Sequence, residues 1–399
     1  MQARGGLRIL GHAMALHFTR AEFARRQAAA RAALREAGLD ALLLFAQESL
    51  YYLTGFDSSG YVFFQCGVLT ADAQPFTLLT RRPDLEQARR TSVIEDIRLW
   101  YDADGANPAL DLKGILEEKG CRGARVGVEL ATYGLTGANW ERVRRALEGW
   151  CRLEDASDVV RALRLVKSPA ELEYVRRAAA LADDALLAMI QAARPGAFEG
   201  DILAAGQSAI FRGGGDVAPS GPVLGSGERA LLVRSSTGST HLGERDQLTI
   251  EFAATYRRYT ACLMRTLAIG ATDPRQARMF EVTREALSAM TDAAAPGRPL
   301  GEIDAAHRRA YDGAGFGHAR MAACGYSLGA TYRPTWMDVP PMLYAGNPTP
   351  ARPGMVLFLH AILADARAGL AMSLGHTIVV TETGREVLSR LTPVYEACR

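Results

Sequence analysis

The stretch Gln247–Gly270 constrains the fold of this chain more tightly than any other. Gln247–Ala253 alternates apolar and polar residues, Tyr259–Ile269 is a second run rich in β-forming residues, and the residues between them are polar. This pattern predicts a β-hairpin. An acid, Glu251, falls within the apolar context of the first strand, where a buried carboxylate needs a partner or a chemical role. Because arginines lie nearby in the sequence, a structural ion pair and a functional acid both stay open.

Length and composition bound the class of protein. A chain of 399 residues, 48% apolar and 23% charged, predicts a globular protein of two domains. The net charge of +2 gives no reason to expect nucleic acid or a membrane surface as a partner, and no apolar run is as long as a membrane span. The six cysteines lack zinc-site spacing, which favours reduced thiols in a cytoplasmic protein. No signal peptide is expected at the N-terminus, where Met14 is an alternative start.

The first part of the chain alternates helical and strand patterns. Phe18–Gly38 has apolar residues at helical spacing, and Leu39–Ala46 is a short, wholly apolar run typical of a strand buried on both faces. Tyr51–Gly55 and Ala124–Glu129 are interpreted as further strands. This alternation predicts an α/β domain, to which we assign residues 15–160.

The second part, residues 161–399, begins with a clear helix signal. Asp155–Lys167 is interpreted as the connection, and Ser168 with Pro169 and Glu171 forms a capping pattern that opens a long helix. Three further helices surround the hairpin in sequence, and the residues after about 320 are rich in strand patterns. The whole chain is therefore predicted to be an α+β protein.

Two residues near the hairpin or in glycine-rich surroundings are candidates for a site. His241 lies in a loop just before the hairpin and is a candidate general base, although a lone loop histidine is more often a surface residue. Tyr326 lies in the phrase ACGYSLG, where glycines let the backbone approach a ligand closely. A packed tyrosine with a satisfied hydroxyl is the alternative interpretation.

Further candidates follow in the last third of the chain. The long irregular segment Thr331–Pro353 carries Trp336 and Asp338, and such segments are often lids or binding loops. His360 and His376 fall on late strands, where a packed histidine is the common alternative. Two histidines and one acid supply too few carboxylates for a hard-metal site, and no ligand cluster has a recognisable spacing.

Several phrases together resemble the creatinase/aminopeptidase P/prolidase family, whose catalytic domain has the pita-bread fold. They are LDALLLF, YYLTGFD, LRLVKSPAELEYVRRAAALAD, the Arg265-Thr266 end of the hairpin and GYSLG. The resemblance covers nearly the whole chain. It implies a creatinase-like N-terminal α/β domain and a pita-bread catalytic domain. It also implies a homodimer in which Leu50–Phe63 of one protomer borders the pocket of the other.

The departures from this family are informative. Its metal-dependent members hold two metal ions with two aspartates on the hairpin, a histidine, and two glutamates on late strands. The resemblance places these positions at Glu251, Cys262, Tyr326, His360 and Gly375. At most one carboxylate ligand survives, whereas a two-metal centre needs several. We therefore expect no two-metal site and no ordinary Xaa-Pro peptidase activity.

Metal-free members of the family give a second set of expectations. Ectoine hydrolases share the GGGD stretch, a hairpin glutamate followed by Arg-x-Tyr, the GYS-x-G phrase and a Pro-x-Trp phrase. The resemblance implies that Glu251 attacks an electrophilic amidine carbon or acts as a base. His241 or His376, the latter at the position of the creatinase histidine, would activate water or move a proton. The substrate-binding residues implied alongside Tyr326 are Tyr259, Cys262, Arg265, Trp336, Asp338 and His360.

The sequence thus predicts a metal-independent, cofactor-free hydrolase. Its reaction would be cleavage of a non-peptide C–N bond, of the cyclic amidine, amide or guanidine type, in a small cationic or zwitterionic metabolite. Three alternatives stay open: a non-catalytic ligand-binding member, a lyase or cyclase on the same scaffold, and an Xaa-Pro metallopeptidase with unusual ligands.

Overall fold

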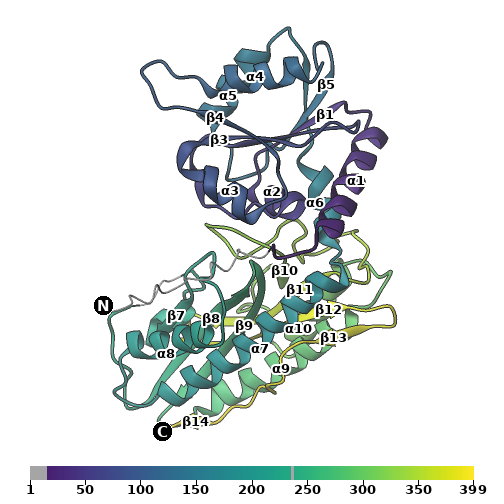
Figure 1. The fold of residues 1–399 in the computed structure, drawn as a ribbon. Helices are drawn as coiled ribbons and strands as arrows, with labels where there is room; N and C mark the ends of the chain where they lie inside the picture. The colour runs from purple at the N-terminus through teal and green to yellow at the C-terminus, as the bar shows by residue number, and fades with distance from the viewer. Residues whose placement is uncertain (1–15, 235–237) are drawn as a thin grey trace, which may run out of the picture. The chain divides into compact units, whose positions relative to one another are not determined.

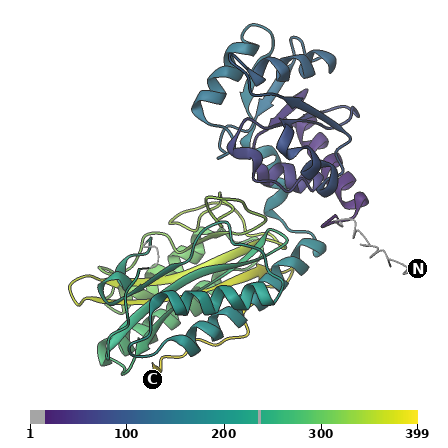
Figure 2. The same ribbon diagram turned by 60° about the vertical axis from the view of Figure 1, so that its left-hand side comes forward.

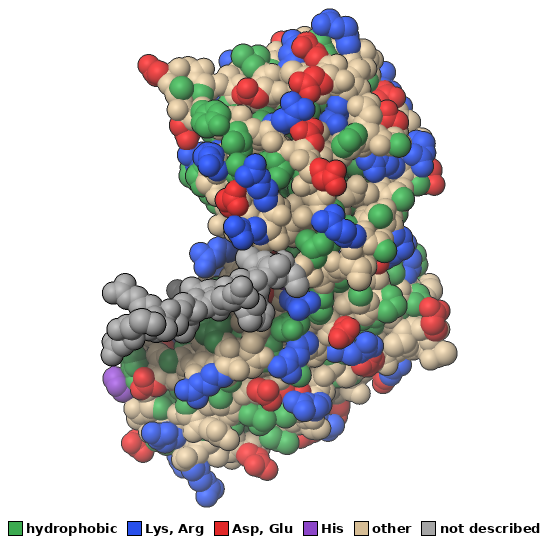
Figure 3. Space-filling model, viewed as in Figure 1, with side chains coloured by type: hydrophobic (Ala, Val, Ile, Leu, Met, Phe, Trp, Pro, Cys, Tyr) green, Lys and Arg blue, Asp and Glu red, His purple; other side chains and the backbone are tan. Residues whose placement is uncertain are grey.

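The computed structural model describes residues 16–234 and 238–399, and the expectations about a signal peptide and a start at Met14 lie outside these residues. The chain divides into two compact units, Met1–Arg164 and Leu165–Arg399. Within the described residues, no helix combines the length and apolar character needed to cross a bilayer. On the face drawn in Figure 3, basic and acidic side chains are intermixed, in keeping with a net charge of +2.

The first unit is built on a six-stranded mixed sheet with the order β4-β3-β2-β1-β5-β6 (Figure 1). Its strands are β1 (Ala41–Leu44), β2 (Cys66–Thr70), β3 (Thr77–Arg81), β4 (Asp96–Trp100), β5 (Arg125–Val128) and β6 (Arg152–Asp155). Its helices are α1 (Arg20–Glu36), α2 (Gln47–Thr54), α3 (Leu85–Thr91), α4 (Pro108–Glu118), α5 (Gly137–Leu147) and α6 (Ser157–Leu165), with 3-10 turns at Gly60–Val62 and Arg82–Asp84.

Strand β1 lies at the centre of this unit and is buried on both faces. Leu43 belongs to one apolar cluster, whereas Leu42 and Leu44 belong to the cluster on the other face. The wholly apolar run predicted this burial correctly. The strand predicted at Tyr51–Gly55 was wrong, because these residues end helix α2, where Gly55 adopts a φ of 83°. A short apolar run does not by itself distinguish a strand from a buried helical turn.

The second unit is built on an eight-stranded sheet whose main path is β10-β11-β12-β9-β8-β7. Its strands are β7 (Val223–Ser226), β8 (Asp246–Tyr256), β9 (Tyr259–Ile269), β10 (Gly325–Ser327), β11 (Val356–Asp365), β12 (Leu370–Val380), β13 (Arg385–Val387) and β14 (Ala397–Cys398). Its helices are α7 (Pro169–Ala192), α8 (Glu199–Arg212), α9 (Pro274–Ala293) and α10 (Gly301–Gly313), with a 3-10 helix at Gly227–Leu231. The predicted hairpin is confirmed as β8 and β9, which pair along their whole lengths.

Helices cover one face of this second sheet, as the long helices lying along the strands in Figure 2 show. Ile250 and Phe252 of β8 pack in one apolar cluster with residues of α7 and α8. Leu357 and Leu359 of β11 pack in another with residues of α9 and α10. Since neighbouring residues of a strand point to opposite faces, Glu251 of β8 lies on the face away from these helices.

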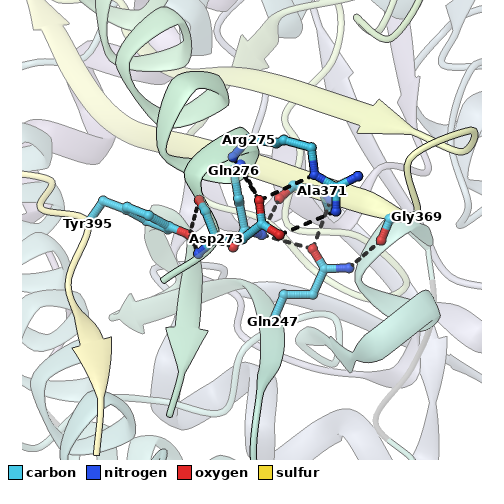
Figure 4. Close-up of polar contacts among 7 residues, drawn as sticks. All are labelled: Gln247, Asp273, Arg275, Gln276, Gly369, Ala371 and Tyr395. Atoms are coloured by element: carbon cyan, nitrogen blue, oxygen red, sulfur yellow. Dashed lines mark hydrogen bonds and ion pairs between the residues drawn. The ribbon is translucent and has the colours of Figure 1, made fainter. Parts of the chain in front are cut away.

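A buried amide network fixes the far end of the hairpin (Figure 4). The Gln276 side chain on α9 donates to Gln247 Oε1 at 2.8 Å and to the Ala371 carbonyl at 2.8 Å. Its own oxygen accepts from the Tyr395 hydroxyl at 2.8 Å. Gln247 in turn donates to the Gly369 carbonyl at 2.8 Å. One glutamine thus joins α9 to strand β8, strand β12 and the C-terminal segment.

Replacement of Gln276 by alanine should lower the free energy of unfolding of the second unit by about 2–3 kcal/mol, because buried partners lose their hydrogen bonds. Chemical denaturation followed by fluorescence measures this change. The control is Arg275→Ala at the neighbouring position, where an exposed ion pair with Asp273 is worth at most about 0.5 kcal/mol. Equal effects of the two variants would contradict the role of the network.

Candidate active site

Glu251 is the central acid of the site. It is 9% exposed and lies in the middle of β8. The Tyr326 hydroxyl on β10 donates a hydrogen bond to Glu251 Oε1 at 3.1 Å. The Trp336 indole N–H donates to the Tyr326 oxygen at 2.7 Å. Within the described part of the chain, Tyr326 supplies the single hydrogen bond to this carboxyl group, and no ion pair to it is formed. The alternative that Glu251 forms a structural ion pair with a nearby arginine is therefore not supported.

Burial governs the electrostatics of Glu251. Loss of hydration raises the pKa of its carboxyl group to about 7, whereas the Tyr326 hydrogen bond and the charge of Arg234 act in the opposite direction without offsetting it. At neutral pH, therefore, both protonation states are well populated. Such a group is suited to nucleophilic or general-base chemistry.

Strand register brings the distant positions of the site into one row. Glu251 pairs with Met264 of β9, Met264 pairs with Gly375 of β12, and Gly375 pairs with His360 of β11. Directly paired residues on neighbouring strands share a face of the sheet. The Tyr326 and His360 rings lie 5.7 Å apart between centroids. The row therefore joins β10 and β11 to the strand that carries the acid.

Cys262 completes this face, two residues before Met264 on β9. It is buried, and its burial raises the pKa of its thiol well above the ordinary value. Cys262 therefore joins Glu251, Tyr326, His360 and Gly375 on one face. These are the positions that the resemblance aligns with metal ligands.

The groups at these positions do not fit a two-metal centre. Gly375 has no side chain, and the Phe358 ring lies 2.7 Å from where its Cβ would be. His360 is a neutral imidazole, because burial lowers its pKa to about 4, and its Nδ1 has no hydrogen-bond partner within the described residues. One carboxyl, one phenol, one thiol and one imidazole lack the bridging carboxylates that two metal ions need. Among the described residues these groups do not form a cluster of three metal ligands.

Three predicted site residues lie on the opposite, helix-covered face. His376 pairs with Leu359, and its Nε2 lies 2.9 Å from the Thr291 hydroxyl on α9. The Arg265 side chain donates to backbone carbonyls, including that of Gly375 at 2.8 Å. The Tyr259 hydroxyl donates to Glu171 at the start of α7 at 2.8 Å. The placement of these three side chains contradicts a direct role for them beside Glu251.

Two further predicted residues have other surroundings. His241 is exposed before the start of β8, and its ring packs against Phe198 with centroids 5.1 Å apart. The structure does not bring it into contact with Glu251. Asp338 is buried, and its carboxylate fills the space that a side chain at Gly329 would need. The last glycine of GYSLG therefore makes room for Asp338 rather than for a ligand.

Two residues near the acid were missed by sequence reasoning. Arg234 is the charged group that acts on Glu251, and its only signal is its place in the loop before the hairpin. Phe358 packs against both Tyr326 and His360, with centroids 5.4 and 5.6 Å apart. Its spacing of two from His360 on a strand is a signal that predicts a shared face.

Comparison with known proteins identifies the family of this chain. Residues 173–382 match metallopeptidase family M24, and residues 26–166 match the creatinase/prolidase N-terminal domain. The chain therefore belongs to the M24 creatinase/prolidase family of hydrolases, with the pita-bread fold that was predicted.

Individual relatives span two activities. The chain is 28% identical over 396 residues to an ectoine hydrolase of Halomonas elongata, covering 94% of this chain and 97% of that protein. It is 24% identical over 233 residues to an Xaa-Pro dipeptidase of Pyrococcus furiosus, covering 58% and 65%. The structure of an Xaa-Pro dipeptidase from Bacillus anthracis superposes with a TM-score of 0.82 at 21% identity, covering 94% and 99%, and so shares the fold.

Replacement of Glu251 by glutamine should stabilise the second unit at pH 8 by up to roughly 3 kcal/mol, because the native pKa of about 7 lies above the ordinary value of 4.5. Between these values the native state holds a proton that the unfolded state has lost, so the stability of the wild type falls as pH rises. Denaturation of both proteins from pH 4 to 8 tests this. A difference that does not shrink toward pH 4 would contradict a raised pKa.

Proposed function

We propose that this protein hydrolyses a non-peptide C–N bond in a small cationic or zwitterionic metabolite, without a catalytic metal, and that Glu251 is its nucleophile or general base. One observation carries the proposal: a buried acid with a pKa near 7 lies on the face to which the resemblance assigns the metal ligands, and among the described residues Tyr326 alone donates a hydrogen bond to it. The other ligand positions hold Cys262, Tyr326, His360 and Gly375, which suit a metal-free site.

An amidinium or guanidinium substrate would supply the positive charge that Glu251 lacks. Its arrival would lower the pKa of the carboxyl group and ionise it, beside an electrophilic carbon. As nucleophile, a Glu251 oxygen forms a bond to that carbon, the C–N bond breaks, and the leaving nitrogen takes up a proton. Water then cleaves the ester-like intermediate and restores the carboxylate. As general base, Glu251 instead takes a proton from the attacking water.

Neighbouring groups support these steps. Trp336 fixes the Tyr326 oxygen, so that the phenol proton points to Glu251 rather than to solvent. His360 is neutral and lies on the same face, and its Nδ1 has no hydrogen-bond partner among the residues that the structure describes, which suits proton transfer. These placements favour His360 over His241 and His376 as the histidine of the site.

The relatives add to this argument. The ectoine hydrolase is 28% identical to this chain over 94% of its length, which makes its activity one that the chain is worth testing for. The name of the ectoine hydrolase gives ectoine, a cyclic amidine, as its substrate. The C–N bond of a cyclic amidine is one that a lone buried carboxylate is suited to cleave. Cyclic amidines are therefore the first substrates to test, followed by lactams and guanidino compounds.

Glu251→Gln should abolish turnover of whichever of these compounds the wild type hydrolyses, because the amide is neither nucleophile nor base. The matched control is Glu129→Gln in the first unit, where another buried acid has a pKa raised to about 7 but accepts hydrogen bonds from backbone and Ser49. This variant should retain kcat. Activity in Glu251→Gln, or ligand binding without turnover by the wild type, would refute the proposed role.

The pH profile gives a separate test. Since Glu251 must be ionised, kcat/KM should rise with pH through an apparent pKa near 7. Tyr326→Phe removes a hydrogen bond that lowers the pKa of Glu251, so its profile should move to higher pH. Tyr344→Phe, at an exposed position, should leave the profile unchanged. A profile in Tyr326→Phe identical to the wild type would contradict this coupling.

We also propose a homodimer in which the Leu50–Phe63 segment of one protomer borders the other's pocket. Val62 and Phe63 are 65% and 50% exposed, which is unusual for apolar side chains. Other aromatic residues of this segment, such as Tyr51 and Tyr52, are buried. Light scattering should therefore give the dimer mass for the wild type and a larger monomer fraction for Phe63→Asp. A wild type that is purely monomeric would exclude this arrangement.

A further inference from the structure

Three side chains that commonly bind metals converge on the helix-covered face of the second sheet, away from Glu251. Asp304 and His307 lie about one turn apart on α10, and Cys324 directly precedes β10. Each of the three residues is fully buried. One ligand atom from each residue lies within 4.8 Å of those of the other two. This geometry brings a carboxylate, an imidazole and a thiol to one point.

The three residues have few hydrogen-bond partners within the described part of the chain. Neither ring nitrogen of His307 has a hydrogen-bond partner among the described residues, and the Asp304 carboxyl group has the Cys324 thiol beside it as its one potential donor there. The Cys324 thiol has a long contact of 3.8 Å to the Leu343 carbonyl and interacts with the Asp304 carboxyl group beside it. Buried polar groups are nearly always satisfied, and each one left without a partner costs free energy. The buried His307 nitrogens beside Asp304 and Cys324 therefore indicate a site for a bound ligand.

We propose that Asp304, His307 and Cys324 bind a zinc ion. Oxygen, nitrogen and sulfur donors together suit Zn²⁺, whereas Mg²⁺ and Ca²⁺ prefer sites made of oxygen alone. One carboxylate and one thiolate neutralise the charge of the ion in an apolar core. Three protein ligands leave a fourth position for water. Asp304 also lies at a surface depression that Gly301 and Arg308 line.

This site is distinct from the metal positions of the family. Cys324 packs in the same apolar cluster as Leu359, on the α9/α10 face, whereas Tyr326 and His360 lie on the opposite face. The ion would nevertheless act close to the acid site. The Cys324 carbonyl accepts a hydrogen bond from the His360 N–H at 3.0 Å. A metal bound here would tie α10 to the strand that carries Tyr326, which stabilises that strand without entering the reaction.

The test begins with the full-length wild type, stripped of metal by a chelator and titrated with Zn²⁺ alone. We expect one equivalent to be retained through gel filtration and the melting temperature to rise. Titration with Co²⁺ should give the charge-transfer absorption of a cobalt–thiolate bond. Failure of the wild type to retain one equivalent, or cobalt binding without this absorption, would overturn the proposal, and neither result depends on any variant.

Variants then locate the ion. Cys324→Ala should remove the cobalt–thiolate absorption, and His307→Ala should weaken Zn²⁺ binding by about tenfold or more. The matched control is Cys262→Ala, which removes an equally buried thiol from the face of Glu251 and should preserve both signals. Loss of the absorption in Cys262→Ala with its retention in Cys324→Ala would place the metal beside Glu251 and refute the site proposed here.

Discussion

The hydrogen bond from Tyr326 to Glu251, supported by Trp336, is the interaction on which the site depends. It crosses from β10 to β8 and is the only polar contact that the described residues offer this carboxyl group. An ion pair would have held the acid permanently ionised. A single phenol leaves its pKa near 7, so its charge responds to what enters the pocket. The reactivity that we propose follows from the small number of hydrogen bonds made to this carboxyl group.

The two faces of the second sheet hold two different candidate sites, the acid site of Glu251 and the proposed metal site. Glu251, Cys262 and His360 lie on one face, and the cluster of Asp304, His307 and Cys324 lies on the other, beneath α10. Cys324 comes directly before β10, outside the alternation of that strand, and Gly325 between it and Tyr326 has a φ of 153°. The proposed metal on the helix-covered face and the acid on the opposite face therefore belong to the same sheet but take part in different chemistry.

The family scaffold accommodates the change of ligands through compensating packing. Where metal-dependent members would have a glutamate, this chain has Gly375, and the Phe358 ring occupies the space beside it. Gly329 similarly leaves room for the carboxylate of Asp338. Because the vacated volume is filled, restoring one ligand by substitution would create a clash before it created a metal site.

Sequence patterns sufficed for the hairpin, the buried strand β1 and the family, because alternation and short motifs are local properties. They did not predict that the side chains of His376, Arg265 and Tyr259 lie on the helix-covered face, away from Glu251. Each stands an odd number of residues from a position on the face of Glu251, namely Gly375 or Cys262, and the two-residue period of a strand sends it to the other face.

The sequence by itself determined the family and the fold, and it singled out Glu251 as the candidate acid, since these inferences rest on short runs of consecutive residues. Only the tertiary structure decided which aromatic group holds Glu251 and which histidine shares its face. It alone revealed that Asp304, His307 and Cys324 meet. These facts depend on how strands and a helix that are far apart in the chain pack together. The burial that sets the pKa of Glu251 likewise exists only in the packed structure.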